Sequence, residues 1–284
     1  MSEKPVTRRD QQRLQRLFNR KAADFDRHGW LHREVASRLL EHLEPVALEP
    51  KNVLELGSAT GECGRELTRR YRSARVYSLD FASQMLFQAR TKTSRWFNRQ
   101  VFVCAAAEQL CFADHSQQLV CGNLLLPWIE DPTRLLREAH RVLEAGGLLM
   151  MSNFGPQTLH ELREAFSQVD SAAHVNAFMD MHDLGDALTS TGFRDVVVDA
   201  ERLNVSYRTV GALLRELQEM GVGNANPLRR RGLMGRESLA KLRRAFEENS
   251  EDNQYYLSFE LIFAHGWKPQ RSANPVEVRW PDQE

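Results

Sequence analysis

The stretch from Asn52 to Asp80, NVLELGSATGECGRELTRRYRSARVYSLD, decides the fold of this chain. It begins with a short apolar run, Val53–Leu56, which predicts a strand. The small residues GSATG predict a tight turn, and the helical pattern Glu62–Tyr71 follows them. A second run, Arg75–Leu79, predicts another strand that ends on Asp80. Strand, tight turn, helix and strand in this order open a nucleotide-binding α/β sheet.

The turn between the first strand and the helix has the composition of a ligand-binding loop. Small side chains let the backbone approach a ligand closely, and the start of a helix offers unpaired N–H groups. Asp80, at the end of the second strand, is placed to accept hydrogen bonds from both hydroxyls of a ribose. The loop E-x-G-x-A-x-G, Glu55–Gly61, is neither G-x-G-x-x-G nor G-x-x-x-x-G-K-[ST], so nucleoside triphosphate binding has no support. A purely structural turn in another kind of α/β protein remains the alternative.

Bulk properties of the chain limit its function classes. Its 284 residues suit one large domain, and 38 basic side chains balance 38 acidic ones. A balanced charge argues against binding nucleic acid through bulk charge. The cysteines lack zinc-site spacing and lie in or beside apolar segments, which predicts reduced core residues: Cys63, Cys104, Cys111 and Cys121. Because neither a signal-peptide pattern nor an apolar run of about 20 residues occurs, we predict a cytoplasmic protein without membrane spans.

The segment ahead of the first strand is predicted to be a helical lid. Residues 1–9 are predicted to be disordered. Over residues 10–45 apolar side chains recur at threes and fours, with a break near His28–Gly29. A helix here would lie near the mouth of the ligand crevice and could close it. A helix that merely packs on the sheet would show the same periodicity, so both interpretations stay open.

Residues 46–268 are predicted to form the ligand-binding domain. Further strands are predicted over Gln100–Ala105, Leu119–Asn123 and Leu148–Asn153. Helices are predicted over residues 83–92, with Ser83 as the N-cap, and over residues 132–143. Five strands that alternate with helices predict a parallel sheet with helices on both faces.

The second half of the chain adds helices around two more strands. These strands are predicted over residues 196–203 and 255–265, and the helices over residues 157–168, 180–190, 210–220 and 237–247. The stretch 205–250 between the two strands is predicted to be a helical insertion that covers the site. Residues 269–284 are predicted to be a disordered tail.

Motifs inside and outside the core match one family. VLELGSATG (Val53–Gly61) resembles the first motif of class I S-adenosylmethionine methyltransferases, [DE]-x-G-x-G-x-G. FNRKAADFD (Phe18–Asp26) and HVNAF (His174–Phe178) lie outside that motif and discriminate better. Up to about Lys268 the chain resembles the malonyl-acyl-carrier-protein O-methyltransferases of biotin synthesis. The resemblance implies a Rossmann-like α/β fold: a seven-stranded, mostly parallel sheet with helices on both faces, an N-terminal helical lid and a helical insertion before the last strand.

The resemblance also implies a reaction. Enzymes of this family transfer the methyl group of S-adenosylmethionine to the free carboxylate of a malonyl thioester, giving the methyl ester that primes pimeloyl synthesis for biotin. A malonyl carboxylate is already ionised near pH 7, so the reaction needs no general base. The protein must supply in-line positioning in a site shielded from water. The sequence contains no acid–base constellation, and we therefore assign no catalytic residue.

Cofactor-binding roles follow from the resemblance, position by position. The loop would line the methionine and ribose end of S-adenosylmethionine, Asp80 would hold the ribose hydroxyls, and Phe81 would pack on the adenine. Ala107 and Glu108 would border the adenine, and Asn123 would lie near the methionine moiety, although Asn also simply caps strands. The implied set is Gly57, Ala59, Gly61, Asp80, Phe81, Ala107, Glu108 and Asn123.

The chain departs from the family pattern at several positions. Ala59 replaces a Gly, which is tolerable at negative φ and damaging at positive φ. Ala106 replaces an Asp that accepts from the adenine amino group, a loss of about 1–2 kcal/mol in affinity. Pro127 and Ala177 replace a polar residue and an Arg, and Phe25 replaces a lid Tyr. Two alternatives therefore stay open: a binding or assembly protein with a degenerate cofactor site, and a hydroxylase or methyltransferase acting on another substrate. Mitochondrial complex I assembly factors that hydroxylate arginine share this layout.

Residues on the substrate side are predicted from their place in the chain. Arg229, Arg230 and Arg231, with Arg236, Arg243 and Arg244, form a basic patch that could steer an acidic acyl carrier protein, or be a solvated face. Phe25, His174 and Asn176 could reach the substrate, with loop stabilisation as the alternative for the two polar residues. His28 and His32 share a helix face without a third ligand, so we predict no metal site. A monomer is expected.

Overall fold

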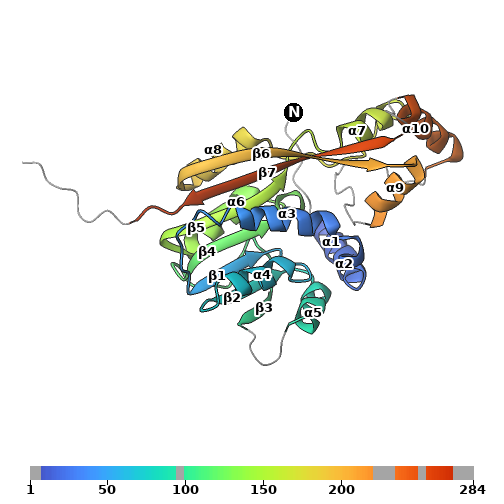
Figure 1. Ribbon diagram of the computed structural model, residues 1–284. Helices are drawn as coiled ribbons and strands as arrows, with labels where there is room; N and C mark the ends of the chain where they lie inside the picture. The colour runs from blue at the N-terminus through green and yellow to red at the C-terminus, as the bar shows by residue number, and fades with distance from the viewer. Residues whose placement is uncertain (1–7, 94–98, 220–233, 249–253, 271–284) are drawn as a thin grey trace, which may run out of the picture.

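The computed structural model describes residues 8–93, 99–219, 234–248 and 254–270. These residues form one sheet of seven strands in the order β3-β2-β1-β4-β5-β7-β6 (Figure 1). Strands β1 to β5 pair in parallel, whereas β7 is antiparallel to both of its neighbours. The fold predicted from the sequence is confirmed. The strands are β1 (Asn52–Leu56), β2 (Arg75–Asp80), β3 (Gln100–Cys104), β4 (Gln117–Asn123), β5 (Leu143–Phe154), β6 (Arg194–Tyr207) and β7 (Tyr255–Trp267).

Helices cover both faces of the sheet. One face packs against α3 and α4 through buried residues such as Val35 and Leu67, and the other against α6 and α8 through residues such as Leu136 and Leu188. The helices are α1 (Arg8–Lys21), α2 (Phe25–His28), α3 (Trp30–Glu41), α4 (Glu62–Arg70), α5 (Ser83–Thr91), α6 (Pro132–Val142), α7 (His160–Ser167), α8 (Met181–Thr191), α9 (Val210–Glu219) and α10 (Arg236–Glu248), with a 3-10 turn at Leu126–Trp128.

The N-terminal segment has two structural roles. It is broken at residues 22–24 as well as at Gly29. Helix α3 is a packed helix, because Leu31, Val35 and Leu39 are fully buried against the sheet. Helix α1, which begins at Arg8, instead contacts α5 beside the ends of the strands. The packed interpretation therefore holds for α3, and the lid interpretation stays a prediction for α1.

Two local predictions fail for identifiable reasons. Ala82, not Ser83, is the N-cap of α5; the Ala82 N–H is taken by Asp80, and Asn19 of α1 caps the Gln84 N–H at 2.9 Å. The connection from β3 to β4, residues 105–116, contains turns and no helix, so strict alternation is wrong here. Side chains of α6 satisfy its backbone instead: Arg141 donates to Phe112 O and Leu110 O, and Glu138 accepts from Leu110 N.

Strands β6 and β7 extend past the other strands toward the side of the molecule where α7, α9 and α10 lie (Figure 1). Helix α9 follows β6 directly, and α10 contacts α7. The insertion predicted over residues 205–250 is helical over α9 and α10, but its first residues, 205–207, still belong to β6. Arg229 and Arg231 lie outside the described residues. Residues 1–7 and 271–284 also lie outside them, so the disorder predicted for the two termini stays a prediction.

Lys268 fixes the chain at the end of β7. Its ammonium group donates to His140 O at 2.6 Å and to Leu143 O at 2.7 Å, the carbonyls at the C-terminal end of α6. Burial lowers the pKa of this Lys. Among the described helices, none combines the length and apolar character needed to cross a bilayer.

Candidate cofactor site

Two small cavities lie at the carboxyl ends of β1, β2 and β4. In the strand order, β1 lies between β2 and β4, so the order of the parallel strands reverses at β1, and such a point places a crevice at the carboxyl ends of the strands. The cavities measure about 40 Å³ and about 50 Å³, and Gly57 lines both of them. A side chain on Gly57 would meet Leu125 Cδ1 at 2.8 Å, and its φ of 68° favours glycine. Gly57 is therefore the point at which the two cavities adjoin.

Asp80 is the acidic group of this site. Its carboxylate is 6% exposed and lines the 50 Å³ cavity. Each oxygen already accepts one backbone N–H at 2.8 Å, Oδ2 from Ala59 and Oδ1 from Ala82. These bonds fix the carboxylate, and each oxygen keeps a further lone pair for a ligand hydroxyl. Burial raises the pKa of Asp80 to about 6, against the opposing effect of the two N–H groups.

The loop after β1 contains Ala59, a residue at which the sequence departs from the family motif. Ala59 has a φ of 45°, in the left-handed region that costs an L-residue about 1–2 kcal/mol. The strain is held by the bond from the Ala59 N–H to Asp80. Gly61, at φ 76°, is the N-cap of α4, and a side chain there would meet Ala89 Cβ at 3.0 Å. Gly61 therefore shapes the loop and packs against α5.

We expect Ala59→Gly to raise the free energy of unfolding by about 0.5–1 kcal/mol. The substitution removes the strain of about 1–2 kcal/mol and adds an unfolded-state entropy cost of about 0.4–1 kcal/mol. Thermal unfolding should show a higher Tm. Ala106→Gly is the matched control, because Ala106 lines the same site without a positive φ and should lose stability. Equal losses in both variants would contradict the account of strain at Ala59.

A buried hydrogen-bond chain supports the loop from beneath. Glu55 accepts from the Gly64 N–H at 2.9 Å and from Ser78 Oγ at 2.5 Å, and Gln100 Nε2 donates to Ser78 Oγ at 2.7 Å. Burial raises the pKa of Glu55 to about 7, against the donors Ser78 and Gly64. The chain joins β1, β2 and β3 to the first turn of α4. The sequence identified Glu55 only as the first letter of the loop motif; its contacts with Ser78 and Gln100 become visible only once the strands pair.

The 50 Å³ cavity has the character of a base-binding pocket. Its walls include Phe81 and Ala107, as predicted, together with Trp128 and Ile129. Phe18 of α1 stacks edge-on against both Phe81 and Trp128, at 5.8 and 5.2 Å between ring centroids. Apolar and aromatic walls of this kind suit an adenine ring.

Glu108 closes one side of the 50 Å³ cavity. Its Oε1 accepts from Glu130 N at 3.3 Å and from Gln11 Nε2 at 3.4 Å. Ala106 also lines the cavity, and its methyl group offers no acceptor to an adenine amino group. Glu108 is therefore the carboxylate that remains at this end of the site.

The 40 Å³ cavity contains polar atoms that need partners. Asn123 lines it, but its amide donates to His32 O at 2.9 Å and accepts from Ser152 Oγ at 2.7 Å, so it links β4, β5 and α3. His32 Nδ1 and Ser58 Oγ are fully buried in this cavity and have no hydrogen-bond partner within the described structure. Burial lowers the pKa of His32 to about 4, so the ring is neutral near pH 7. From the sequence, His32 was considered only together with His28 as a metal-binding pair, so its place in this cavity was not predicted.

The residues fit S-adenosylmethionine in a closed form of the crevice. A fixed carboxylate, an apolar base pocket and two unpartnered polar atoms match a ribose, an adenine and an amino-acid group in that order. Each cavity is far smaller than the roughly 300–1,000 Å³ typical of ligand pockets. Helix α1 covers the crevice: Gln15 donates to Phe81 O at 2.5 Å, and Phe18 packs on Phe81. Ligand entry therefore requires α1 to move.

Asp26 of α2 connects the N-terminal segment to the loop after β1 and to the end of α5. Its carboxylate accepts from Thr60 Oγ1 at 2.5 Å and pairs with Lys92 at the end of α5. Burial would raise its pKa, but these two donors outweigh burial and lower it. Phe25 precedes Asp26 and lines the 40 Å³ cavity, so this predicted substrate residue lies at the methionine end of the site. The N-terminal segment is thus hydrogen-bonded directly to the loop that follows β1.

We expect the affinity for S-adenosylmethionine to fall as the pH falls through about 6. A ribose diol binds the Asp80 carboxylate better than the protonated acid, so binding favours the deprotonated form and proton uptake competes with it. Below pH 6 the dissociation constant should rise by up to about tenfold per pH unit. Calorimetric titrations between pH 5 and pH 8 measure this, with Tm as the check that the fold persists. A flat profile would show that Asp80 does not hold the ribose.

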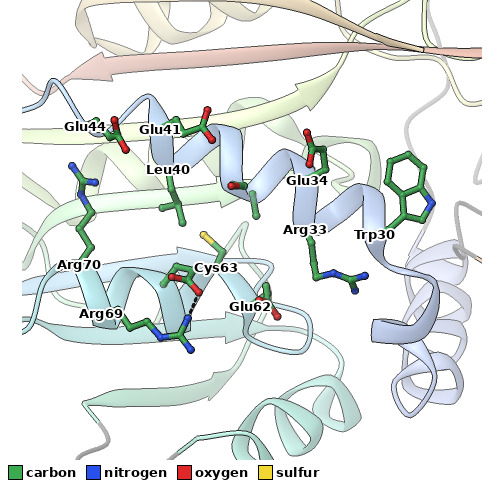
Figure 2. Close-up of a pocket in the computed structure, with 13 residues that line it drawn as sticks. Trp30, Arg33, Glu34, Leu40, Glu41, Glu44, Glu62, Cys63, Arg69 and Arg70 are labelled. Carbon is green, nitrogen blue, oxygen red and sulfur yellow. Dashed lines mark hydrogen bonds and ion pairs between the residues drawn. The ribbon is translucent and has the colours of Figure 1, made fainter. Parts of the chain in front are cut away.

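A third, larger cavity lies on the outer side of α4. Figure 2 shows this groove of about 890 Å³ between α3 and α4, with Glu34, Glu41, Arg69 and Arg70 along its walls. Charged side chains dominate it, and Arg69 pairs with Glu66 across its floor. It shares Cys63 with the 40 Å³ cavity, and its apolar residues Trp30 and Leu40 stand among charged side chains rather than forming an enclosed base pocket. Its size therefore does not make it the cofactor site.

An apolar cavity of about 620 Å³ lies on the other side of α1. Leu17 and Lys21 of α1, Phe166 of α7 and Leu214 and Leu217 of α9 contribute to its walls. Helix α1 separates it from the crevice, because Gln15 and Phe18 face Phe81. Its volume lies within the usual range of ligand pockets.

His174 and Asn176 both line this apolar cavity. His174 stacks on Phe166 with 3.7 Å between ring centroids, and its Nε2 lies 2.7 Å from Asp170 Oδ1. These contacts order the loop ahead of α8. The structure thus combines the two interpretations of His174, since it stabilises the loop and faces the cavity as well.

Comparisons with known proteins agree with this geometry. Residues 54–151 match the family described as "Methyltransferase domain". The chain is 40% identical over 270 residues to the malonyl-[acyl-carrier protein] O-methyltransferase of Gallionella capsiferriformans, covering 93% of each protein. It is 41% identical over 267 residues to the protein of that name from Laribacter hongkongensis, covering 92% of this chain and 90% of that protein.

Solved structures show the same fold at low sequence identity. A SAM-dependent methyltransferase from Thermotoga maritima, 20% identical, has a TM-score of 0.54 and covers 90% of this chain and 99% of its own. The YcgJ protein of Bacillus subtilis, 12% identical, has a TM-score of 0.58 and covers 84% and 99% respectively. Fold, site and sequence relationship agree, and the chain belongs to the malonyl-[acyl-carrier protein] O-methyltransferase family.

Proposed function

We propose that this chain methylates the free carboxylate of a malonyl group carried by an acyl carrier protein. The observation that carries the proposal is the fixed, buried Asp80 carboxylate beside an apolar pocket in a chain about 40% identical to proteins of that name. The cofactor is S-adenosylmethionine, which supplies an electrophilic methyl group when bound. The product ester would serve the pimeloyl branch of biotin synthesis.

The chain's own residues perform binding, orientation and exclusion of water. Asp80 holds the ribose, Gly57 lets the backbone approach the ligand, and the buried Ser58 and His32 bind the amino-acid end. Because His32 is neutral, it adds no charge that would attract or repel a malonyl carboxylate. Helix α1 shields the crevice, which strengthens electrostatic attraction between a cationic methyl donor and an anionic acceptor. Proton transfer is not required, in agreement with the absence of an assigned catalytic residue.

The apolar 620 Å³ cavity is the proposed site of the acyl arm. Its walls suit a flexible thioester chain, while His174 and Asn176 give it polar contacts. Phe25, which lines the 40 Å³ cavity, would contact the malonyl end of this arm beside the methionine end of the cofactor. Arg236, Arg243 and Arg244 on α10 are exposed and would face an acidic carrier protein, extending toward Arg229 and Arg231 in the sequence.

Two other functions were left open by the sequence. A binding or assembly factor with a degenerate cofactor site is disfavoured, because Asp80 and Glu55 keep complete hydrogen-bond sets around the loop. A hydroxylase or a methyltransferase for another substrate is disfavoured by the names of the relatives. Carrier-linked malonate is the acceptor that we propose.

The cellular setting is also proposed. We expect a cytoplasmic monomer without a nucleic-acid partner. The balanced charge of the chain supports the lack of a nucleic-acid partner, and the free buried thiols of Cys63 and Cys121 suit a reducing compartment. Light scattering of the purified protein measures the oligomeric state.

The experiment compares three acceptors: malonyl-acyl carrier protein, malonyl-coenzyme A and acetyl-acyl carrier protein. Methyl transfer from labelled S-adenosylmethionine should occur with the two malonyl compounds and not with acetyl, which lacks the free carboxylate. The double variant Arg243→Glu/Arg244→Glu should raise KM for the carrier protein by about 5- to 10-fold and leave malonyl-coenzyme A unchanged. Arg69→Glu on α4 is the matched control. Transfer to acetyl-acyl carrier protein would overturn the proposal.

A further inference from the structure

A group of metal-ligating side chains lies far from the cofactor crevice, where the end of α3 meets the edge strand β6. His42 is the residue that ends α3, and Asp199 and Glu201 lie two positions apart on β6, hence on one face of the sheet. One ligand atom from each of the three lies within 4.8 Å of the others. No sequence motif indicates this group, because residue 42 and residues 199–201 meet only in the fold.

Neighbouring residues orient each of the three side chains. The His42 ring packs on Phe263, with 4.6 Å between centroids, and Phe263 pairs directly with Asp199 across the strands. Arg38 holds Glu201 Oε2 at 2.7 Å, which leaves Oε1 on the side of His42 Nε2, 3.9 Å away. The Ala200 N–H occupies Asp199 Oδ1 at 2.8 Å and leaves Oδ2 for another partner. Contacts that orient ligands in this way are typical of metal sites.

The local charge also suits a dication. Arg38 pairs with Glu34 and Glu201, and Asp199 adds a third carboxylate beside Glu201, which leaves an excess of two negative charges over the one guanidinium. An ion with two positive charges would neutralise this excess. The sequence had predicted no metal site, from the spacing of the cysteines and from the His28 and His32 pair, and neither argument includes the three residues of this group.

We propose that His42, Asp199 and Glu201 bind a divalent transition-metal ion such as Zn²⁺. One imidazole and two carboxylates form a donor set that Zn²⁺ accepts, with water completing the shell. Bonds of about 2.0–2.2 Å require ligand atoms within about 4.2 Å of one another, so small rotations of the exposed Asp199 and the half-buried Glu201 suffice.

His265 is a second imidazole near this site. It lies two residues from Phe263 on the same face of β7, opposite Val197 of β6. The strand pairing therefore puts His265 on the same face of the sheet as Asp199.

A bound ion would join the lid segment to the sheet. Helix α3 continues from α1 and α2, and β6 is the last strand at its edge of the sheet. A metal between them would stabilise the folded protein in proportion to ion concentration. The ion would also hold the end of α3 in place. Helix α3 belongs to the N-terminal segment whose first helix, α1, covers the cofactor crevice.

The test uses Co²⁺ as a spectroscopic substitute for Zn²⁺ on tag-free, chelator-treated protein. Cys104→Ser and Cys111→Ser form the background, because both thiols are exposed and would bind these ions. Co²⁺ absorption and Zn²⁺ calorimetry are measured for this background, for Asp199→Asn and for His42→Gln. Glu34→Gln is the matched control, since Glu34 contacts the same Arg38 but lies outside the ligand group.

We expect one ion per chain, a higher Tm with Zn²⁺, and affinity weakened at least about tenfold by Asp199→Asn and by His42→Gln but not by Glu34→Gln. Asp199 is exposed, so its variant keeps the fold even if His42→Gln does not. Equal affinity in the background and in Asp199→Asn would overturn the proposal. All readouts are independent of methyl transfer, so failure here leaves the proposed function unaffected.

Discussion

Asp80→Asn should reduce the affinity for S-adenosylmethionine and S-adenosylhomocysteine by at least about 100-fold. The substitution keeps the shape but removes the charge that two ribose hydroxyls would bind, and each such bond contributes about 1.5–3 kcal/mol. It also replaces one acceptor oxygen by an NH₂ group, which cannot accept the hydrogen bond from the Ala59 or Ala82 N–H. The loop therefore loses one of its two bonds to residue 80. Calorimetric titration with both ligands measures the loss.

The fold of Asp80→Asn should persist, because the native state already disfavours the charge of this buried carboxylate. A similar Tm would separate lost binding from lost folding. Asp114→Asn is the control: Asp114 is an exposed carboxylate that pairs with Arg141 and lines neither of the two crevice cavities. Unchanged ligand affinity in Asp80→Asn would remove the cofactor role of this residue.

Gly64→Ala should destabilise the protein by about 2–4 kcal/mol, although alanine usually stabilises a helix by about 0.5–1 kcal/mol. A methyl group on Gly64 would lie 2.3 Å from Glu55 Oε2, 2.4 Å from Gln100 Nε2 and 2.6 Å from Ser78 Oγ. To relieve the overlap, α4 must move away and lose the bond from the Gly64 N–H to Glu55. We expect Tm to fall by roughly 5–12 °C in thermal unfolding.

Gly185→Ala is the matched control for this overpacking. Gly185 lies within α8, and a methyl group there would make an ordinary contact with Val198 Cγ2 at 3.5 Å. That variant should gain stability, because only helix propensity changes. We therefore expect the change in the free energy of unfolding to have opposite signs for Gly64→Ala and Gly185→Ala. A stabilising Gly64→Ala would refute the role of the hydrogen-bond chain through Glu55.

The sequence was sufficient for features that depend on local pattern. The alternation of apolar runs, small-residue turns and helical periods between Asn52 and Asp80 predicts β1, α4 and β2 almost to the residue. The same pattern places Gly57 and Asp80 at adjacent strand ends, because parallel strands bring their carboxyl ends to one edge. It also identifies Ala59 as a position where the sign of φ matters.

Features that depend on long-range contacts could not be predicted in this way. Ser83 has the chemistry of an N-cap, but Asn19 from α1 takes that role across 65 residues of sequence. Periodicity shows Gly64 as an ordinary helix residue, because its neighbours Ser78 and Gln100 come from other strands. Likewise, the carbonyl of His32 holds Asn123 only once α3 lies over the end of β4. Side-chain roles of this kind are set by packing.

The most direct test is methyl transfer by the purified full-length protein to malonyl-acyl carrier protein. Intact-mass spectrometry of the carrier, after incubation with S-adenosylmethionine, reports the product. We predict that the malonyl-carrier gains the mass of one methyl group in place of a proton, and that Asp80→Asn lowers the rate at sub-saturating cofactor. A carrier that remains unmodified by folded protein able to bind S-adenosylmethionine would contradict the account.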